Sequence, residues 1–167
     1  RVLVLSGSLP PKAPQGFYAD CCRLAQQANV PVIMDARGEP LAQAMKYRPL
    51  MVKPNRAELG GMFGEQISSD DDLRRLTKRL IELGTSCALI TMGAKGAVLS
   101  DGRDFWFIPA PKVQLSNPIG SGDSVAAGFA AGLVDGLSQR DCAIYGIACG
   151  AANAMTPIPG VVHKADV

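Results

Sequence analysis

The sequence is poor in the residue types on which several common active sites depend. Its 167 residues include a single histidine, His163, and no two of its five cysteines have C-x-x-C spacing. A structural zinc site needs several Cys or His ligands at short spacings, so we do not expect one. A Ser-His-Asp or Cys-His hydrolase is also disfavoured, because its only candidate base would be His163, near the end of the sequence.

Long apolar runs and a strong excess of charge are missing as well. The opening apolar run, 2–5, is far shorter than the roughly 20 residues of a membrane span, and we recognise no signal peptide. The net charge of +2 comes without a run of Lys or Arg, which argues against a dedicated nucleic-acid surface. The cysteines are odd in number, and Cys87, Cys142 and Cys149 lie among apolar residues. This usage is typical of buried thiols in a reducing compartment, so we expect a cytoplasmic protein.

What the sequence does contain is an alternation of short apolar runs and amphipathic segments. The runs that predict buried strands are 2–5, 30–34, 50–52 and 87–91, and a further pair at 97–100 and 105–108 indicates a hairpin that turns at Asp101-Gly102. The segments with helical character are 16–28, 40–46, 70–83, 121–136 and 139–155. Ser68 or Ser69, followed by acidic residues, is a suitable start for the third helix.

This alternation predicts an α/β domain with a mostly parallel sheet and helices on both faces. In such sheets, ligands bind beyond the carboxyl ends of the strands. Polar or Gly-rich clusters follow the predicted strands at those ends, and they are Ser6-Gly7-Ser8, Asp35, Lys53-Pro54-Asn55 and Thr91-Met92-Gly93. Their common position predicts a ligand site at this edge of the sheet.

Gly120-Ser121-Gly122-Asp123 stands directly before a predicted helix. The glycines let the backbone turn tightly, and the helix start favours an anion, so a phosphoryl group that gains negative charge would be stabilised there. Asp123 would then accept a proton from an attacking hydroxyl. Taken alone, these four residues are better explained as a glycine turn with an Asp helix cap, and neither a Walker motif nor G-x-G-x-x-G is present.

Five motifs in a fixed order change that assessment. They are 5–11, 35–39, 52–59, 91–96 and 117–132, the last reading NPIGSGDSVAAGFAAG. With them the chain resembles the ribokinase-like sugar kinases over nearly all of its length. Within these it is most similar to the phosphofructokinase-B type, which includes 1-phosphofructokinases, 6-phosphofructokinases and tagatose-6-phosphate kinases.

The resemblance implies a fold and an activity. The fold is a mostly parallel, Rossmann-like three-layer sandwich, and residues 1–167 correspond to the C-terminal, nucleotide-binding part of the kinase domain. The N-terminal sheet, the lid and the sugar-binding part are absent, and a start directly in a strand agrees with a piece of a longer protein. The implied activity is transfer of the γ-phosphate of ATP to a hydroxyl of a sugar phosphate, with a ketohexose phosphate expected.

The resemblance also assigns roles to single residues. Asp123 is the expected base, and Gly120, Ser121 and Gly122 form the expected anion hole. The residues expected to bind nucleotide are Lys53, Asn55, Thr91, Gly93, Gly96 and Asn153, and those expected at the sugar-phosphate side are Ser6, Gly7 and Ser8. Glu58, together with Asn55, is expected to act on Mg²⁺ through water, which suits an ion that keeps several of its waters.

Several of these residues have plainer explanations. Asn55 and Glu58 can cap a helix, Gly93 and Gly96 can form a simple turn, and Asn153 can satisfy a packing contact. Asp35 can support the Mg²⁺ site or merely end a strand. Two departures from the family pattern stand near the site: Lys12 replaces a frequent Gly, and Pro118, which lacks a backbone N–H, replaces Thr, Ser or Ala.

The expected cofactors are ATP and Mg²⁺, with a monovalent cation as a further candidate. The expected partners are ATP and a small sugar-phosphate substrate, without nucleic acid or membrane, and the full-length protein is expected to form a homodimer through the absent lid. Two alternatives stay open: a fragment that binds nucleotide but is inactive without its N-terminal half, and another ribokinase-like enzyme such as a nucleoside or pyridoxal kinase. The motifs at 6–11 and 52–59 favour the phosphosugar branch, without choosing among its substrates.

Overall fold

The structure is a computed structural model that describes all 167 residues. It contains a six-stranded sheet whose strand order follows the sequence, β1-β2-β3-β4-β5-β6. The chain divides into two compact units: unit 1 consists of residues 1–90 and 100–105, and unit 2 of residues 91–99 and 106–167. No helix in either unit is long and apolar enough to cross a membrane.

Unit 1 is built on parallel strands. The strands are β1 (Leu3–Ser6), β2 (Val32–Asp35), β3 (Met51–Val52) and β4 (Cys87–Thr91), and each pairs in parallel with the next. The register aligns Ser6 with Asp35 at the carboxyl ends of β1 and β2. β2, β3 and β4 are buried along almost their whole length, as is typical of parallel strands. The predicted parallel α/β architecture is therefore confirmed.

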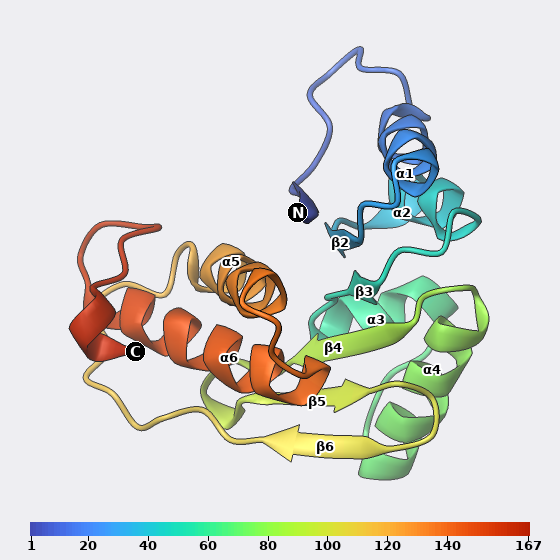
Figure 1. Cartoon of the computed structure of the whole chain (residues 1–167). Coiled ribbons are helices and arrows are strands. Elements are labelled where there is room, and N and C mark those ends of the chain that lie inside the picture. The colour runs from blue at the N-terminus through green and yellow to red at the C-terminus, as the bar shows by residue number, and fades with distance from the viewer. The chain divides into compact units, whose positions relative to one another are not determined.

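Four helices belong to unit 1. They are α1 (Phe17–Gln27), α2 (Gly38–Met45), α3 (Arg56–Phe63) and α4 (Asp70–Glu82), and α1 packs against α2 while α3 packs against α4 (Figure 1). At the start of α4, the Ser69 hydroxyl accepts a hydrogen bond from the Asp72 N–H, and the Asp72 carboxylate accepts one from the Ser69 N–H. Hydrogen bonds from the hydroxyls and backbones of Ser69 and Ser68 hold the pKa of Asp72 well below its usual range. The predicted cap of this helix is thus confirmed.

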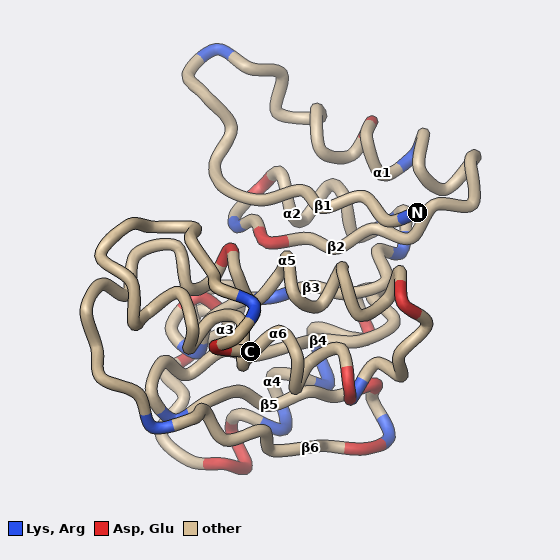
Figure 2. The backbone as a smooth tube through the Cα atoms, turned by 60° about the vertical axis from the view of Figure 1, so that its left-hand side comes forward, with Lys and Arg blue, Asp and Glu red and all other residues tan.

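Unit 2 combines two long helices with two strands whose adjoining ends, within 100–105, belong to unit 1. A 3₁₀ turn, η1 (Gly93–Lys95), precedes β5 (Ala97–Ser100) and β6 (Phe105–Ile108), which run in opposite directions (Figure 1). The helices α5 (Ser121–Val134) and α6 (Gln139–Met155) follow, and a second 3₁₀ turn, η2 (Lys164–Asp166), lies near the end. Asp123, Arg140 and Asp141 are the only charged residues of α5 and α6, so both helices are tan over most of their length in Figure 2.

Glycines set the distance between α5 and α6, which lie side by side (Figure 1). A Cβ at Gly128 would lie 2.9 Å from the Cα of Gly146, and a Cβ at Gly146 would lie 2.6 Å from the carbonyl oxygen of Val125. A Cβ at Gly150 would lie 3.1 Å from the carbonyl oxygen of Ser121. Because packed interiors do not tolerate such overlaps, the two helices approach this closely only where side chains are missing.

Most of the predicted elements are confirmed, with ends that differ by one to a few residues. Helix α3 is the exception, since only its start was considered as a cap. It contains Gly60 and Gly61, which are poor helix formers, and it lacks a clear apolar stripe, so its sequence signal is weak. A capping box at Asn55 and a left-handed Gly64 define its two ends.

We predict that Gly146→Ala lowers the free energy of unfolding by about 2 kcal/mol, because the new methyl group meets the backbone of α5. Gly61→Ala is the matched control: it also lies within a helix, but a Cβ added there would have no neighbouring atom within 4 Å. This control gains up to about 1 kcal/mol from helix propensity. Urea unfolding of both variants checks the prediction, and equal stabilities would contradict the packing argument.

Candidate functional site

The start of α5 depends on Gly120. This residue is the N-cap of the helix, and its φ of +82° lies in the left-handed region. A Cβ at this position would lie 2.9 Å from the backbone nitrogen of Gly160. Both the backbone conformation and the lack of space therefore require glycine. Because of this turn, α5 can begin directly at Ser121.

Asn117 ties the segment before α5 to the segment after α6. Its Oδ1 accepts a hydrogen bond from the Ile119 N–H at 3.0 Å, and its Nδ2 donates to the Pro157 carbonyl at 3.0 Å. The backbone N–H groups of Ser116 and Asn117 donate to the Ala154 carbonyl at 2.8 and 3.1 Å. The approach to the glycine turn is thus held by side-chain and backbone hydrogen bonds on both sides of Pro118.

Asn153 makes a second connection of this kind. Its Nδ2 donates to the Ile119 carbonyl at 2.9 Å and to Ser121 Oγ at 3.1 Å, and its Oδ1 accepts from the Gly160 N–H at 2.7 Å. The side chain is fully buried, with 0% exposure. A packing role for Asn153 is thus realised, while its contact with a nucleotide stays a prediction.

Asp123 lies in the first turn of α5, where it is exposed, as is Gly122 before it. A carboxylate at this position is favoured by the positive end of the helix dipole. The N–H groups of a helix start also favour an anionic ligand, and here that of Ser121 donates to the Pro118 carbonyl at 3.2 Å. The first turn of α5 therefore combines an exposed carboxylate with a helix start that favours anions.

The turn after β4 is a second element that requires glycine. Gly96 has a φ of +99°, and a Cβ there would overlap the carbonyl oxygen of Ile108. The Gly96 carbonyl accepts a hydrogen bond from the Met92 N–H at 2.8 Å, and the Gly96 N–H donates to the Gly93 carbonyl at 2.9 Å. Close backbone packing accounts for Gly96 without reference to a ligand.

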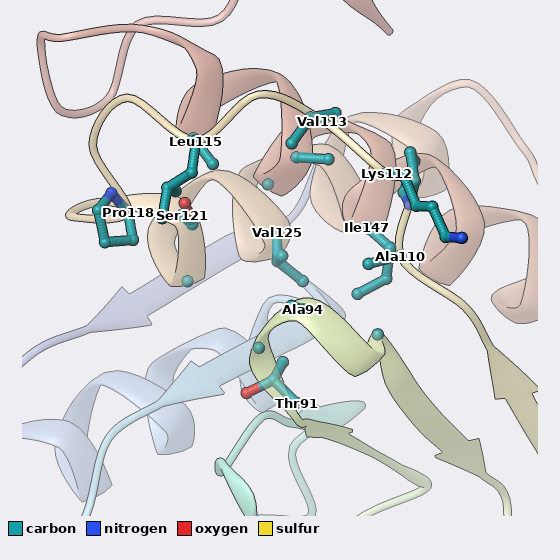
Figure 3. Close-up of a pocket in the computed structure, with 17 residues that line it drawn as sticks. Thr91, Ala94, Ala110, Lys112, Val113, Leu115, Pro118, Ser121, Val125 and Ile147 are labelled. Carbon is teal, nitrogen blue, oxygen red and sulfur yellow. The ribbon is translucent and has the colours of Figure 1, made fainter.

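A cavity of about 530 Å³ in unit 2 brings these two elements together. In Figure 3, Leu115, Pro118 and Ser121 lie at one side of the cavity, Ala110, Lys112 and Ile147 at the other, and Val125 between them. Predicted site residues that line it are Thr91, Gly93, Gly96, Ser121 and Gly122. Gly120, Asp123 and Asn153 are not among the lining residues. The volume falls within the range of small-molecule sites, about 300–1,000 Å³.

Two parts of the cavity wall were not predicted from the sequence. One is the segment between β6 and α5, which contributes Ala110, Pro111, Lys112, Val113 and Leu115, and the other is the α6 face formed by Ile147, Gly150, Ala151 and Ala154. The spacing of the α6 residues by three or four positions was a usable signal, because such residues share one helix face. The first segment has no comparable periodicity. Lys112 is the only charged residue in the wall, so the cavity suits a largely apolar ligand body.

In unit 1, Lys53 is held in an ion pair at the carboxyl ends of the parallel strands. Its Nζ lies 2.9 Å from Oδ2 of Asp35, and the lysine side chain is only 5% exposed against 20% for the aspartate. Ser6 Oγ donates to the same carboxylate oxygen at 3.5 Å. The Tyr18 hydroxyl donates to the carbonyl oxygens of Ser6 and Gly7 at 3.0 and 3.1 Å. The predicted clusters at Ser6 and Lys53 are therefore brought together through Asp35.

Asn55 and Glu58 form a capping box at the start of α3. Asn55 Oδ1 accepts from the Glu58 N–H, and Glu58 Oε2 accepts from the Asn55 N–H, both at 2.9 Å. The helix cap that the sequence allowed is thus present. No group of three or more His, Cys, Asp or Glu side chains is arranged to hold a metal ion. Oε1 of Glu58 lies outside this capping box.

Comparisons with known proteins identify the family. The profile of the pfkB family carbohydrate kinases matches residues 1–157. The chain belongs to the pfkB family of carbohydrate kinases. It is 36% identical over 155 residues to the 1-phosphofructokinase of Bacillus subtilis, a match that covers 93% of this chain and 51% of that protein. This pfkB-family chain thus spans about half the length of the relatives it matches.

Solved structures agree with this fold. Escherichia coli phosphofructokinase-2 in complex with fructose-6-phosphate superposes with a TM-score of 0.87 at 26% identity, over 99% of this chain and 53% of that one. Arabidopsis thaliana ribokinase superposes with a TM-score of 0.82 over 95% of this chain and 51% of that one, but at 22% identity it supports the fold alone. The ribokinase-like fold expected from the sequence is confirmed.

We predict that Asp35→Asn destabilises the chain by about 3 kcal/mol, because it leaves the buried ammonium of Lys53 without the opposite charge of its partner. Lys53→Met should cost less, since Asp35 is more exposed than Lys53 and keeps its hydrogen bond from Ser6. Chemical denaturation at pH 7 compares the two variants. A larger loss of stability in Lys53→Met than in Asp35→Asn would contradict the prediction. It would show that the Asp35 carboxylate depends on the ion pair more than the Lys53 ammonium does.

Proposed function

We propose that this chain is the nucleotide-binding part of a kinase that transfers the γ-phosphate of ATP to a hydroxyl of a sugar phosphate. The observation that carries the proposal is the cavity of unit 2. It combines a largely apolar wall with Ser121 and Gly122 at the start of α5, where an anion is favoured. Membership of a carbohydrate-kinase family supports a phosphoryl-transfer role for such a site.

In the proposed complex, the apolar wall holds adenine and ribose, and the triphosphate points to the helix start. Ile147, Ala151 and Val113 offer carbon surface to the base, as is usual in sites for small molecules. Thr91 and Gly93 lie on the wall formed by the turn after β4. The backbone at Gly120, Ser121 and Gly122 then stabilises the negative charge that develops on the transferring group.

Asp123 is the proposed general base. It accepts the proton of the substrate hydroxyl while the hydroxyl oxygen forms a bond to the γ-phosphorus and the bond from that phosphorus to the β–γ bridging oxygen breaks. ADP leaves with the bridging oxygen. The exposure of Asp123 at the start of α5 is suited to this role, because the carboxylate is reachable by a second substrate.

Mg²⁺ is the ion that the reaction requires to neutralise the phosphates. Glu58 can hold it through a water molecule by means of Oε1, since the capping box uses only Oε2. The backbone N–H of Asn55 orients this carboxylate by donating to Oε2. Lys53 is proposed to bind nucleotide as a point charge, with Asp35 keeping the ammonium in place.

The proposed acceptor is a ketohexose phosphate. The relative at 36% identity is a 1-phosphofructokinase, and a structural relative was solved with fructose-6-phosphate. Ser6, Gly7 and Ser8 are proposed to line the acceptor side. The chain covers about half of those relatives, so a second candidate function is nucleotide binding without turnover. Dependence on a monovalent cation, dimerisation of a longer protein and a cytoplasmic location remain predictions.

Titration calorimetry with Mg²⁺-ATP and a coupled ADP-release assay on the same sample separate these functions. The assay panel contains fructose 1-phosphate, fructose 6-phosphate, tagatose 6-phosphate, ribose and adenosine. We expect saturable binding of ATP. If the chain turns over any acceptor of the panel, we expect that acceptor to be a phosphosugar. Binding without turnover on every acceptor supports the second candidate, and absence of ATP binding would refute both.

We predict that Asp123→Asn lowers kcat by about a hundredfold or more, the usual contribution of a general base, while ATP binding changes little. The coupled assay measures kcat on a protein sample that shows kinase turnover before mutation. Calorimetry measures the ATP affinity of the same sample. Asp135→Asn, at the other end of α5, is the control and should leave both quantities unchanged. Retention of a tenth or more of the rate by Asp123→Asn would rule out its role as base.

A further inference from the structure

The hydrogen bonds of Asn153 surround the glycine turn that precedes α5. Ile119 and Ser121, the residues on either side of Gly120, both accept from its Nδ2, while Gly160 donates to its Oδ1. One buried amide on α6 therefore ties the turn to the segment after α6. All these partners belong to unit 2, as does the cavity.

Several observations indicate that this arrangement fixes the turn instead of contacting a ligand. The side chain has no exposed surface, and both of its polar atoms already have protein partners. Neighbours on α6, Ala151 and Ala154, line the cavity, whereas Asn153 does not. Its Oδ1 would also lie 3.5 Å from a Cβ placed at Gly120, so the amide packs directly beneath the turn.

We propose that Asn153 is a positioning residue that holds the backbone of Ile119, Gly120 and Ser121 in the conformation that receives phosphate. This inference rests on the proposed function, since it assigns phosphate binding to that turn. It differs from the direct nucleotide contact expected for Asn153 from the sequence. Without the amide, the turn can adopt other conformations. Phosphate binding must then order the turn, and this entropy cost weakens the affinity.

A comparison of two ligands distinguishes positioning from contact. Calorimetry measures the affinity of the 167-residue chain for Mg²⁺-ATP and for Mg²⁺-tripolyphosphate, which has no base or ribose. Asn153→Ala should weaken both by the same factor, about tenfold, which is the order expected when hydrogen bonds to a buried turn are lost. A loss confined to ATP would show contact with adenosine, and an unchanged affinity for both would overturn the positioning role.

Two further variants test whether weaker binding results from a general loss of structure. Ser138→Ala removes the N-cap of α6 at the end remote from the turn, so it should lower thermal stability without changing either affinity. Asn153→Asp keeps an acceptor for the Gly160 N–H but has no amide donor for the Ile119 carbonyl, so it should weaken both ligands at least as much as Asn153→Ala does. If Asn153→Ala does not fold, Asn153→Asp is measured in its place. The same outcomes then distinguish positioning from contact.

Hydrogen–deuterium exchange of the chain without ligand tests the positioning role independently. Asn153→Ala or Asn153→Asp should raise deuterium uptake in the peptide that spans 117–123, and Ser138→Ala should not. If the unaltered chain bound neither ATP nor tripolyphosphate, the proposed function would fail, while exchange would still decide whether Asn153 fixes the turn. Unchanged uptake in both Asn153 variants would overturn the inference.

Discussion

The close approach of α5 and α6 is the constraint on which unit 2 depends. Gly128, Gly146 and Gly150 leave room for backbone contact, and Gly150 lies close enough to Ser121 that a Cβ there would be 3.1 Å from its carbonyl oxygen. The start of α5 is thereby fixed against the last turns of α6, where Asn153 and the segment at Gly160 complete the support. One wall of the cavity and the proposed phosphate position are consequences of this single helix contact.

In unit 1, charged side chains are stabilised by pairing with other side chains or with the backbone. The buried Lys53 is compensated by Asp35, and Asn55 and Glu58 satisfy one another at the start of α3. The residues of unit 1 proposed to bind nucleotide and metal therefore have structural partners in the protein, and these partners hold them in place. A cationic side chain that is already desolvated and held in place loses little entropy when it meets a phosphate.

The sequence was sufficient for most strands and helices because their signals are local. Continuous apolar runs predicted β2 and β4, and Ser69 with its acidic successors predicted the start of α4. Thr91, Gly93 and Ser121 were assigned to the site by the family resemblance, and all three line the cavity. The contribution of 110–115 could not be predicted, since an irregular segment owes its position to the surrounding packing. Nor could the bonds of Asn153, because the sequence does not specify which carbonyl groups lie beside a buried amide.

We propose that the cavity of unit 2 holds the nucleotide with its phosphates at the start of α5. A crystal structure of the chain with Mg²⁺ and a non-hydrolysable ATP analogue tests it most directly. We expect the adenine base between the 110–113 segment and the α6 face at Ile147 and Ala151, with the terminal phosphate at the backbone of Gly120 to Gly122. A nucleotide bound outside this cavity, or bound with its base at Ser121 and its phosphates at Lys112, would contradict it.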